Sequence, residues 1–299
     1  MGKRRSRLGC SDKEALAMNQ FADTLLTMGP AILFCPADRP ERYAKALERA
    51  DAVILDLEDA VAPDAKAQAR KFLLENPLDP ARTIVRINAA GTSDFALDLD
   101  AVSQSAYRTV MLAKAESAEQ LRIIADHGVQ PRASIRVIAL CETALGVLRA
   151  AEIAQEPNVV GLMWGAEDLV ASLGGSSSRF ADGRYRAVAL QARSQVLLAA
   201  GAFGKDAVDA VYLDIPDVDG LAAEVNDAVA SGFTATACIH PSQVAVISAG
   251  YAPSATQVAD AEELLTAAAQ AGNGVFQFKG QMIDGPVLKH AEQVLRRAH

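Results

Sequence analysis

Eight short apolar runs, each followed by a stretch of helical periodicity, constrain the fold of this chain more than any other feature. Among the intervening segments, Pro40–Arg49 opens with proline, and residues 117–125 place Ser117 and Gln120 in capping-box spacing. Strands that alternate with helices form parallel sheets, and eight units in series predict a (β/α)8 TIM barrel. The apolar runs lie at residues 31–35, 53–57, 84–87, 110–113, 135–140, 160–164, 210–214 and 235–239.

The length of the chain agrees with a single large core. With 299 residues, of which 51% are hydrophobic, one barrel-sized domain can bury enough apolar surface to fold. We expect residues 1–29 to form a loose N-terminal extension and residues 30–253 to form the barrel. Residues 254–299 hold two further helices, near 255–271 and 286–298, which exceed what a barrel needs. We expect this C-terminal extension to form a cap or lid, or to reach a neighbouring subunit.

Charge and hydropathy exclude several classes of partner. The chain has 29 basic and 37 acidic residues, a net charge of −8, without the basic stripe that nucleic acid requires, so we expect no nucleic-acid partner. The apolar stretches are interrupted before the ~20 residues of a membrane span, and we expect no membrane segment. Cys35, Cys141 and Cys238 fall within or beside apolar runs, as buried thiols in a reducing compartment do, which favours a cytoplasmic location.

Carboxylates follow the apolar runs at the points where strands are expected to end. Glu142 and Asp168 follow neighbouring strands of the predicted barrel, whose carboxyl ends meet at one face. Two buried acids that converge favour a bound cation, and Mg²⁺ prefers such hard oxygen ligands. Taken singly, Asp59, Glu142 or Glu167 could equally be an acid at a helix N-terminus.

Basic residues reach the same face from the third and fourth strands. Arg86 lies in the run IVRIN, where alternation places it in an otherwise buried row, and Lys114 follows the next run. Arg86 is either a functional group or a structural ion pair with a strand-end acid. His240 precedes Pro241, a helix-start signal, and we expect it to have a structural hydrogen-bonding role.

Seven motifs carry a resemblance to a known family from Leu33 onward. They read LFCPADRPERYAKAL, DAVILDLEDAVAPDAKAQAR, TIVRINAAGT, VMLAKAES, ALCETALGVLRAAEIA, GLMWGAEDL and CIHPSQ. Together they resemble the citrate lyase β-subunit-like (CitE-like) branch of the HpcH/HpaI aldolase family, and in particular its stand-alone β-hydroxyacyl-CoA lyases of actinobacterial type. The resemblance implies a Mg²⁺-dependent barrel enzyme, usually a homotrimer or hexamer, that acts on a coenzyme A thioester.

The resemblance also implies roles for individual residues. Glu142 and Asp168 would ligate Mg²⁺, with Glu142 also facing the substrate, and Arg86 would bind the substrate carbonyl or carboxylate. The positions at which relatives contact coenzyme A are Phe34, Arg39 and Lys45.

Three acids complete the site that the resemblance implies. Glu58 and Asp59 would hold metal-bound waters or Arg86. Asp284, in GQMIDGP, lies where relatives present a lid aspartate to the neighbouring subunit, and it could supply the final proton. It could equally be a helix-start acid before Pro286. The chain departs from many relatives in having Pro30 and Ala31 where they carry Arg-Ser.

The reaction so implied is cleavage of a 3-hydroxyacyl-CoA, such as malyl-CoA, citramalyl-CoA or 3-hydroxy-3-methylglutaryl-CoA, to acetyl-CoA and an oxo acid. Such a retro-Claisen step needs a group that polarises the hydroxyl and a cation that faces the developing enolate. One alternative is a class II pyruvate aldolase, although the chain has no histidine at the ends of the first two strands. Others are a citrate lyase β subunit acting on an acyl-carrier-protein thioester and a barrel without catalytic function.

Overall fold

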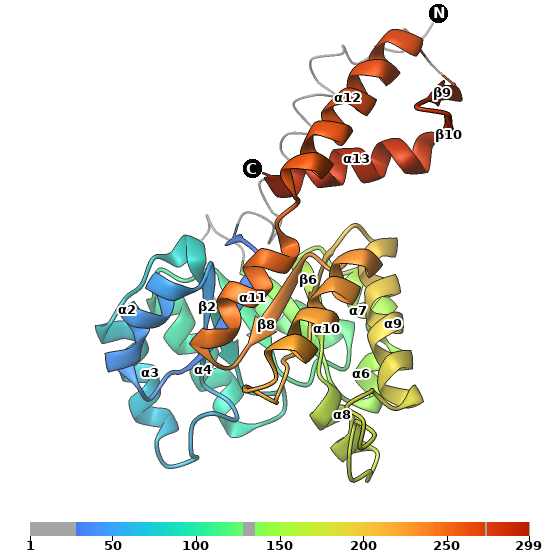
Figure 1. The fold of residues 1–299 in the computed structure, drawn as a ribbon. Coiled ribbons are helices and arrows are strands. Elements are labelled where there is room, and N and C mark those ends of the chain that lie inside the picture. Colours follow the sequence, from blue (N-terminus) through green and yellow to red (C-terminus); the bar gives the residue numbers. More distant parts are fainter. Residues whose placement is uncertain (1–27, 128–134, 273, 299) are drawn as a thin grey trace, which may run out of the picture.

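A closed barrel of eight parallel strands forms the body of the molecule (Figure 1). The computed structural model describes residues 28–127, 135–272 and 274–298. Each strand pairs with the next in sequence, and β8 pairs with β1 to close the ring. This confirms the predicted (β/α)8 TIM barrel. The strands are β1 Ala31–Pro36, β2 Ala52–Asp56, β3 Thr83–Ile87, β4 Thr109–Leu112, β5 Arg136–Cys141, β6 Val159–Trp164, β7 Asp206–Asp209 and β8 Ala235–Cys238.

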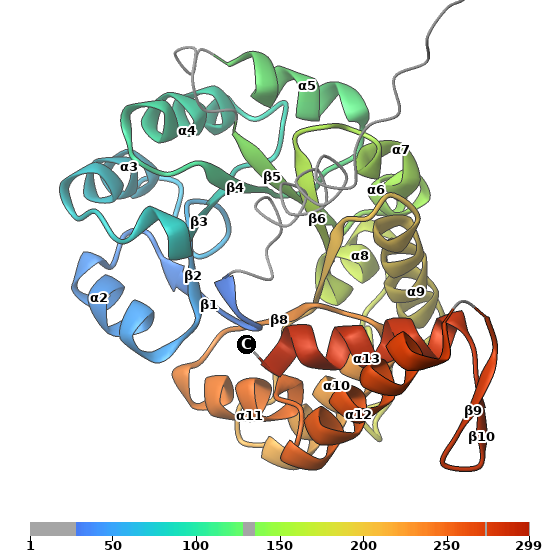
Figure 2. The same ribbon diagram turned by 90° about the horizontal axis from the view of Figure 1, so that it is seen from above.

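Helices surround the strands, as the view along the barrel shows (Figure 2). Two helices follow β5 and two follow β6. The helices of the ring are α2 Pro40–Arg49, α3 Lys66–Glu75, α4 Ser93–Gln104, α5 Ala118–Asp126, α6 Ala144–Leu148, α7 Ala150–Ala154, α8 Ala166–Ser172, α9 Ala187–Ala202, α10 Val218–Ser231 and α11 Pro241–Tyr251, with a short 3₁₀ turn at Pro80–Arg82.

Local sequence signals set the starts of several helices. Pro40 occupies the first turn of α2. Ser117 and Gln120 form the predicted capping box of α5, in which each side chain binds the other residue's backbone N–H. His240 caps α11, and its Nδ1 accepts a hydrogen bond from the Ser242 backbone N–H at 3.2 Å. The structural role expected for His240 is therefore present.

Alternation along the strands divides the apolar side chains into two cores. Residues such as Ile32, Ile54 and Ile84 fill the barrel interior. Their neighbours in sequence, such as Leu33 and Leu55, pack outward against the helices. Cys35, Cys141 and Cys238 are buried and free, as predicted.

One predicted strand is wrong. The seventh strand was expected at residues 210–214, but β7 is Asp206–Asp209, and residues 210–214 belong to the loop that follows it. The prediction followed the apolar run at residues 210–214, whereas the actual strand, DAVD, has an acid at each end and is less apolar. Its register with β6 and β8 places Asp209 inside the protein, where Arg193 of α9 neutralises it at 2.8 Å and Trp164 Nε1 donates to it at 2.6 Å. The other seven predicted strands agree with the structure to within one residue at each end.

We expect Asp209→Ala to lower the free energy of unfolding by about 3 kcal/mol, because the half-buried Arg193 guanidinium would keep only the exposed Asp227 as a partner and the buried Trp164 N–H would lose its acceptor. Chemical denaturation followed by circular dichroism measures this. Asp227→Ala is the matched control, because Asp227 binds the same arginine but its side chain is 63% exposed. Its expected cost is about 0.5 kcal/mol. Equal losses for the two variants would contradict the assignment.

The C-terminal part of the chain projects from the barrel beyond the end of α11 (Figure 1). It comprises α12 Ala255–Ala271, a hairpin of β9 Phe276–Phe278 and β10 Gln281–Ile283, and α13 Gly285–Ala298. Both helices agree with those expected, whereas the hairpin between them was not predicted. An apolar cluster of its own, including Leu264 and Ile283, holds this part together. None of the helices in the described part of the chain has the length and apolar character to cross a lipid bilayer.

Candidate active site

Alternation along the strands directs four side chains into the carboxyl-terminal mouth of the barrel. Asp56, Arg86 and Glu142 each lie two positions after a side chain of the barrel interior, so they point to the same face. The interior residues are Ile54, Ile84 and Leu140, respectively. Phe34 likewise follows Ile32 on β1. These four residues line one pocket of about 270 Å³, together with Trp164, Asp168 and neighbouring groups. The pocket is the size of a small-ligand site and lies where barrel enzymes bind substrates.

Arg86 is held in a fixed orientation by acids. Its Nε and Nη2 donate to the two Asp56 carboxylate oxygens at 2.6 Å each, and its Nη1 lies 3.0 Å from Glu58 Oε2. The guanidinium also lies over the Phe34 ring, 4.9 Å from its centroid. Burial alone would lower the pKa of Arg86, but the bonds to Asp56 and the nearby carboxylates outweigh burial and raise it. Arg86 thus forms a structural ion pair with Asp56 and also places a permanent positive charge in the lining of the pocket.

Glu142 and Asp168 follow neighbouring strands. β5 and β6 pair so that Cys141 lies beside Trp164, and the two acids follow these residues. Glu142 is 3% exposed, and burial, reinforced by the Asp168 charge, raises the pKa of its carboxyl to about 8. Asp168, in the first turn of α8, has a side chain 36% exposed. The two acids expected to share a cation therefore reach the same pocket.

Gly165 makes room for the Glu142 carboxylate. A Cβ atom at this position would lie 2.8 Å from Glu142 Oε2 and 2.9 Å from Glu142 Cβ. Since the backbone φ of Gly165 is −131°, close approach rather than backbone freedom requires glycine here. The glycine of the WGAED motif thus shapes the acidic pocket.

The residues present fit a Mg²⁺ ion. Within the described residues, no group of three or more metal-binding side chains gathers that could hold a metal by itself. Mg²⁺ commonly takes one or two carboxylates and fills its other positions with water and substrate oxygens, so Glu142 and Asp168 suffice. The raised pKa of Glu142 is consistent with a cation site, because a bound positive charge would stabilise the ionised form of a carboxylate that is buried beside another acid.

Lys114 and Asp56 also belong to this site. The Lys114 ammonium contacts Glu58 and lies 3.3 Å from Asp168 Oδ1 and 3.5 Å from Asp59 Oδ2. The sequence indicated Lys114 at a strand end without a specific role. Asp56 was not among the predicted site residues, because Glu58 and Asp59, just beyond the strand, were assigned to the site instead. The inward parity of Asp56 with Ile54 was the signal that could have identified it.

Glu58 and Asp59 occupy different environments. Glu58 is 6% exposed and contacts both Arg86 and Lys114. The Asp59 side chain is 59% exposed. Among the described residues, its one ion-pair partner is Lys114. Glu58 therefore lies where it can orient both cations of the site, whereas Asp59 lies at the solvent-facing rim.

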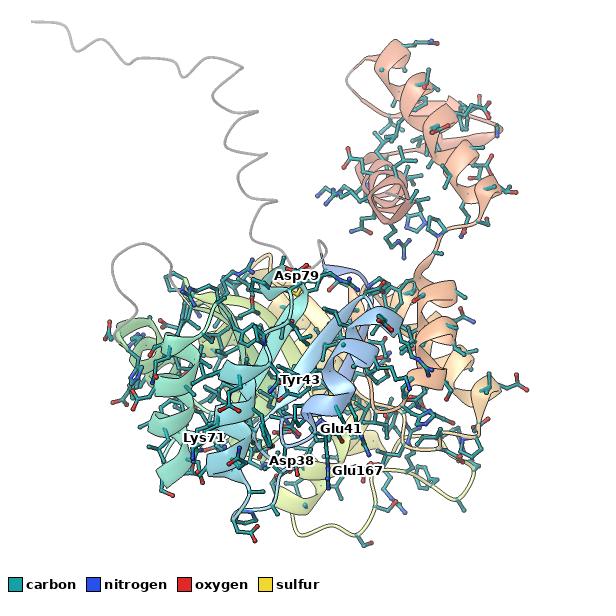
Figure 3. All side chains as sticks on the ribbon, turned by 90° about the vertical axis from the view of Figure 1, so that its left-hand side faces the viewer. Asp38, Glu41, Tyr43, Lys71, Asp79 and Glu167 are labelled. Atoms are coloured by element: carbon teal, nitrogen blue, oxygen red, sulfur yellow. The ribbon has the colours of Figure 1, made fainter. Side chains whose placement is uncertain are left out.

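The three residues expected to contact coenzyme A lie on β1 and around α2. Phe34 lines the pocket, Arg39 immediately precedes α2 with its side chain 57% exposed, and Lys45 is exposed on α2. Figure 3 shows Asp38, beside Arg39, at the same end of the barrel as Glu167 of the pocket.

Asp284 lies apart from these residues within one chain. It is exposed at the start of α13, where its Oδ1 accepts a weak hydrogen bond from the Val287 N–H at 3.5 Å. Figure 3 shows the C-terminal helices beyond the end of the barrel marked by Asp79, opposite the end marked by Asp38 and Glu167. The chain that carries Asp284 thus does not bring it to its own pocket.

Comparison with known proteins identifies relatives over nearly the whole chain. The family model described as HpcH/HpaI aldolase/citrate lyase matches residues 31–241, and a model for C–C bond lyases of the TIM-barrel fold matches residues 188–299. A citrate lyase subunit beta-like protein of Mycobacterium tuberculosis is 58% identical over 274 residues, which cover 92% of this chain and 97% of that protein. Human mitochondrial citramalyl-CoA lyase is 33% identical, with 90% and 85% covered.

A solved structure matches the fold closely. The crystal structure of CitE from Mycobacterium tuberculosis in complex with magnesium, acetoacetate and coenzyme A superimposes with a TM-score of 0.82. The two sequences are 58% identical, and the match covers 92% of this chain and 99% of the other.

Proposed function

Because the chain belongs to the HpcH/HpaI aldolase/citrate lyase family, we propose that it is a Mg²⁺-dependent lyase that cleaves a 3-hydroxyacyl-CoA thioester to acetyl-CoA and an oxo acid. The observation that carries the proposal is the pocket in which Arg86, oriented by Asp56, faces the carboxylate pair Glu142 and Asp168. A fixed cation beside a carboxylate pair that fits a metal suits chemistry in which negative charge develops on an oxygen. The magnesium and coenzyme A bound by the Mycobacterium tuberculosis relative support the same cofactor and ligand class here.

The residues of the chain supply binding and charge in this reaction. Glu142 and Asp168 would hold Mg²⁺, which when bound would lower the pKa of the substrate 3-hydroxyl and polarise the carbonyl that this hydroxyl becomes as the C2–C3 bond breaks. The hydroxyl proton would pass to a carboxylate of the pocket. Arg86 offers its guanidinium to the thioester oxygen as that oxygen gains negative charge, and Asp56 prevents it from turning away. Phe34, Arg39 and Lys45 would contact coenzyme A from β1 and α2.

A proton must reach the carbon that becomes the methyl group of acetyl-CoA, and we assign this role to Asp284 of a second subunit. Its exposure and its place beyond the opposite end of its own barrel support delivery to a neighbour, in a homotrimer or hexamer. An acid on an arm of this kind would reach the substrate only after assembly.

Hybrid oligomers test this assignment. We expect Asp284→Asn and Glu142→Gln to be nearly inactive alone, but co-expression of the two variants with different tags should restore about a quarter of wild-type activity in a cyclic trimer. The reason is that one site in four then combines an intact Glu142 with an intact Asp284 from its neighbour. A hybrid as inactive as its parents would show that both residues must come from one chain.

A panel of substrates tests the function itself. Purified protein with Mg²⁺ would be incubated with malyl-CoA, citramalyl-CoA and 3-hydroxy-3-methylglutaryl-CoA, and acetyl-CoA followed by mass spectrometry. We expect one thioester to be cleaved and EDTA to abolish the cleavage. These acyl chains differ by a methyl or methylene group, worth only about 1–3 kcal/mol in a pocket, so the panel must decide among them.

Failure of all three thioesters would overturn the free coenzyme A proposal for these substrates. Activity on a 4-hydroxy-2-oxo acid would then identify a pyruvate aldolase, and co-purification of an acyl-carrier protein would identify a citrate lyase β subunit. The cytoplasmic location stays a prediction, supported by three buried, free cysteines.

A further inference from the structure

Lys114 contacts both carboxylates that would hold the metal. Its ammonium lies 3.3 Å from Asp168 Oδ1 and also contacts Glu58 and, at 3.5 Å, Asp59. Its backbone N–H donates to Glu142 Oε1 at 3.1 Å. One residue therefore reaches Glu142 through the main chain and Asp168 through the side chain.

The backbone at Lys114 adopts the left-handed conformation that this double contact needs. Its φ is 51°, which is uncommon for a residue other than glycine and costs free energy. On either side, the Ala113 N–H donates to Ile87 of β3 and the Ala115 N–H donates to Leu140 of β5. The turn between them takes the Lys114 N–H out of the strand ladder and directs it to Glu142.

The charges around Lys114 leave the pocket short of positive charge. Two cations share the pocket with six carboxylates, so four negative charges remain when all six are ionised. Arg86 is committed to Asp56 and Glu58 and its side chain is 11% exposed, whereas the Lys114 side chain is 30% exposed and can turn toward solvent. Of these two cations, Lys114 is therefore the one that can move away from the carboxylates. The six carboxylates are those of Asp56, Glu58, Asp59, Glu142, Glu167 and Asp168.

We propose that Lys114 is a positioning residue that competes with Mg²⁺ for the Asp168 carboxylate and so sets the affinity of the site for the metal. The inference rests on the proposed Mg²⁺ site at Glu142 and Asp168. A dipositive ion at these carboxylates repels the nearby ammonium, so the metal binds only as Lys114 withdraws toward Glu58 and Asp59. Lys114 thus keeps the acidic pocket charge-compensated and makes metal binding weaker and more readily reversible.

Isothermal titration of Mg²⁺ into the EDTA-treated, dialysed full-length protein tests this competition without measuring catalysis. We expect Lys114→Met and Lys114→Asn to bind Mg²⁺ about tenfold more tightly than the wild type, because each removes a positive charge that opposes the ion. Lys114→Arg keeps the charge and should bind about as the wild type does. Asparagine tolerates the left-handed backbone, so Lys114→Asn carries the test if Lys114→Met does not fold.

Lys66→Met is the matched control. Lys66 donates to Asn88 and forms none of the ion pairs with the pocket carboxylates, so its loss should leave Mg²⁺ affinity unchanged. Unchanged or weaker binding in the neutral Lys114 variants would overturn the competition while leaving the proposed function in place. No Mg²⁺ binding by the wild type would overturn the metal site itself, and the inference with it.

Discussion

Glu142→Gln is expected to abolish Mg²⁺ binding in calorimetry and to lower kcat/KM for the cleaved thioester by about a thousandfold. Glutamine keeps the shape of the side chain in the space beside Gly165 but removes the negative charge that a hard cation requires. The loss should not reflect unfolding. Burial raises the pKa of the Glu142 carboxyl to about 8, so its ionised form is disfavoured in the fold, and a neutral amide relieves that cost.

The metal-free variant should accordingly melt at or above the wild-type temperature at pH 8. The sign follows from linkage, because a carboxyl whose pKa is raised by folding weakens the native state as pH rises and the group ionises. Glu156→Gln is the control for substitution of a buried glutamate. Glu156 pairs with Arg122 at 2.7 Å, precedes β6 and does not line the pocket, so Mg²⁺ binding and activity should be retained. Normal metal affinity in Glu142→Gln would contradict the site.

Arg86→Lys is expected to lower kcat by about a hundredfold or more while Mg²⁺ still binds. Lysine keeps the charge, but it cannot make the paired bonds to Asp56 that fix the guanidinium, and its point charge does not reproduce the planar fork. A fall in kcat at similar KM, measured by acetyl-CoA release, would identify an interaction made mainly in the transition state.

Arg70→Lys provides the comparison for Arg86→Lys. Arg70 also binds two acids, Asp94 and Asp98 of α4, at 2.9 and 2.8 Å, but it does not line the pocket. Its substitution should reduce thermal stability and leave kcat near the wild-type value. Full activity in Arg86→Lys would show that the arginine serves only as a structural ion pair, which was the other interpretation of this residue.

The two interpretations that the sequence left open for Arg86 turn out to be compatible. The alternation in IVRIN placed Arg86 on the inward face, and the structure adds that its partner is Asp56, reached across the β2–β3 pairing. The acid pair Glu142 and Asp168 was predicted for the same reason, since acids after neighbouring parallel strands meet at one face, and both acids line the same pocket. Lys114 was placed at the same strand ends but received no specific role, because the sequence does not show which carboxylates it contacts.

The misplaced seventh strand shows where apolar runs fail as a guide. Hydrophobicity selects segments that are apolar throughout, but Asp206–Asp209 is a strand because its neighbours β6 and β8 bind its backbone. Its second aspartate is tolerated inside the protein because Arg193, sixteen positions earlier in α9, neutralises it. A segment viewed alone cannot reveal a partner supplied by another helix.

The sequence alone indicated the alternation of strands and helices, the helix starts at Pro40, Ser117 and His240, the inward parity of Arg86, and the place of Glu142 at a strand end. These features are local, because they depend on periodicity and on capping within a few residues. Which charged groups contact each other was visible only in the folded protein. Asp56 and Arg86 lie 30 positions apart, and Glu58 and Lys114 lie 56 apart, and the lateral pairing of β2, β3 and β4 brings them together. The balance of charge that defines the pocket is thus a property of the assembled barrel.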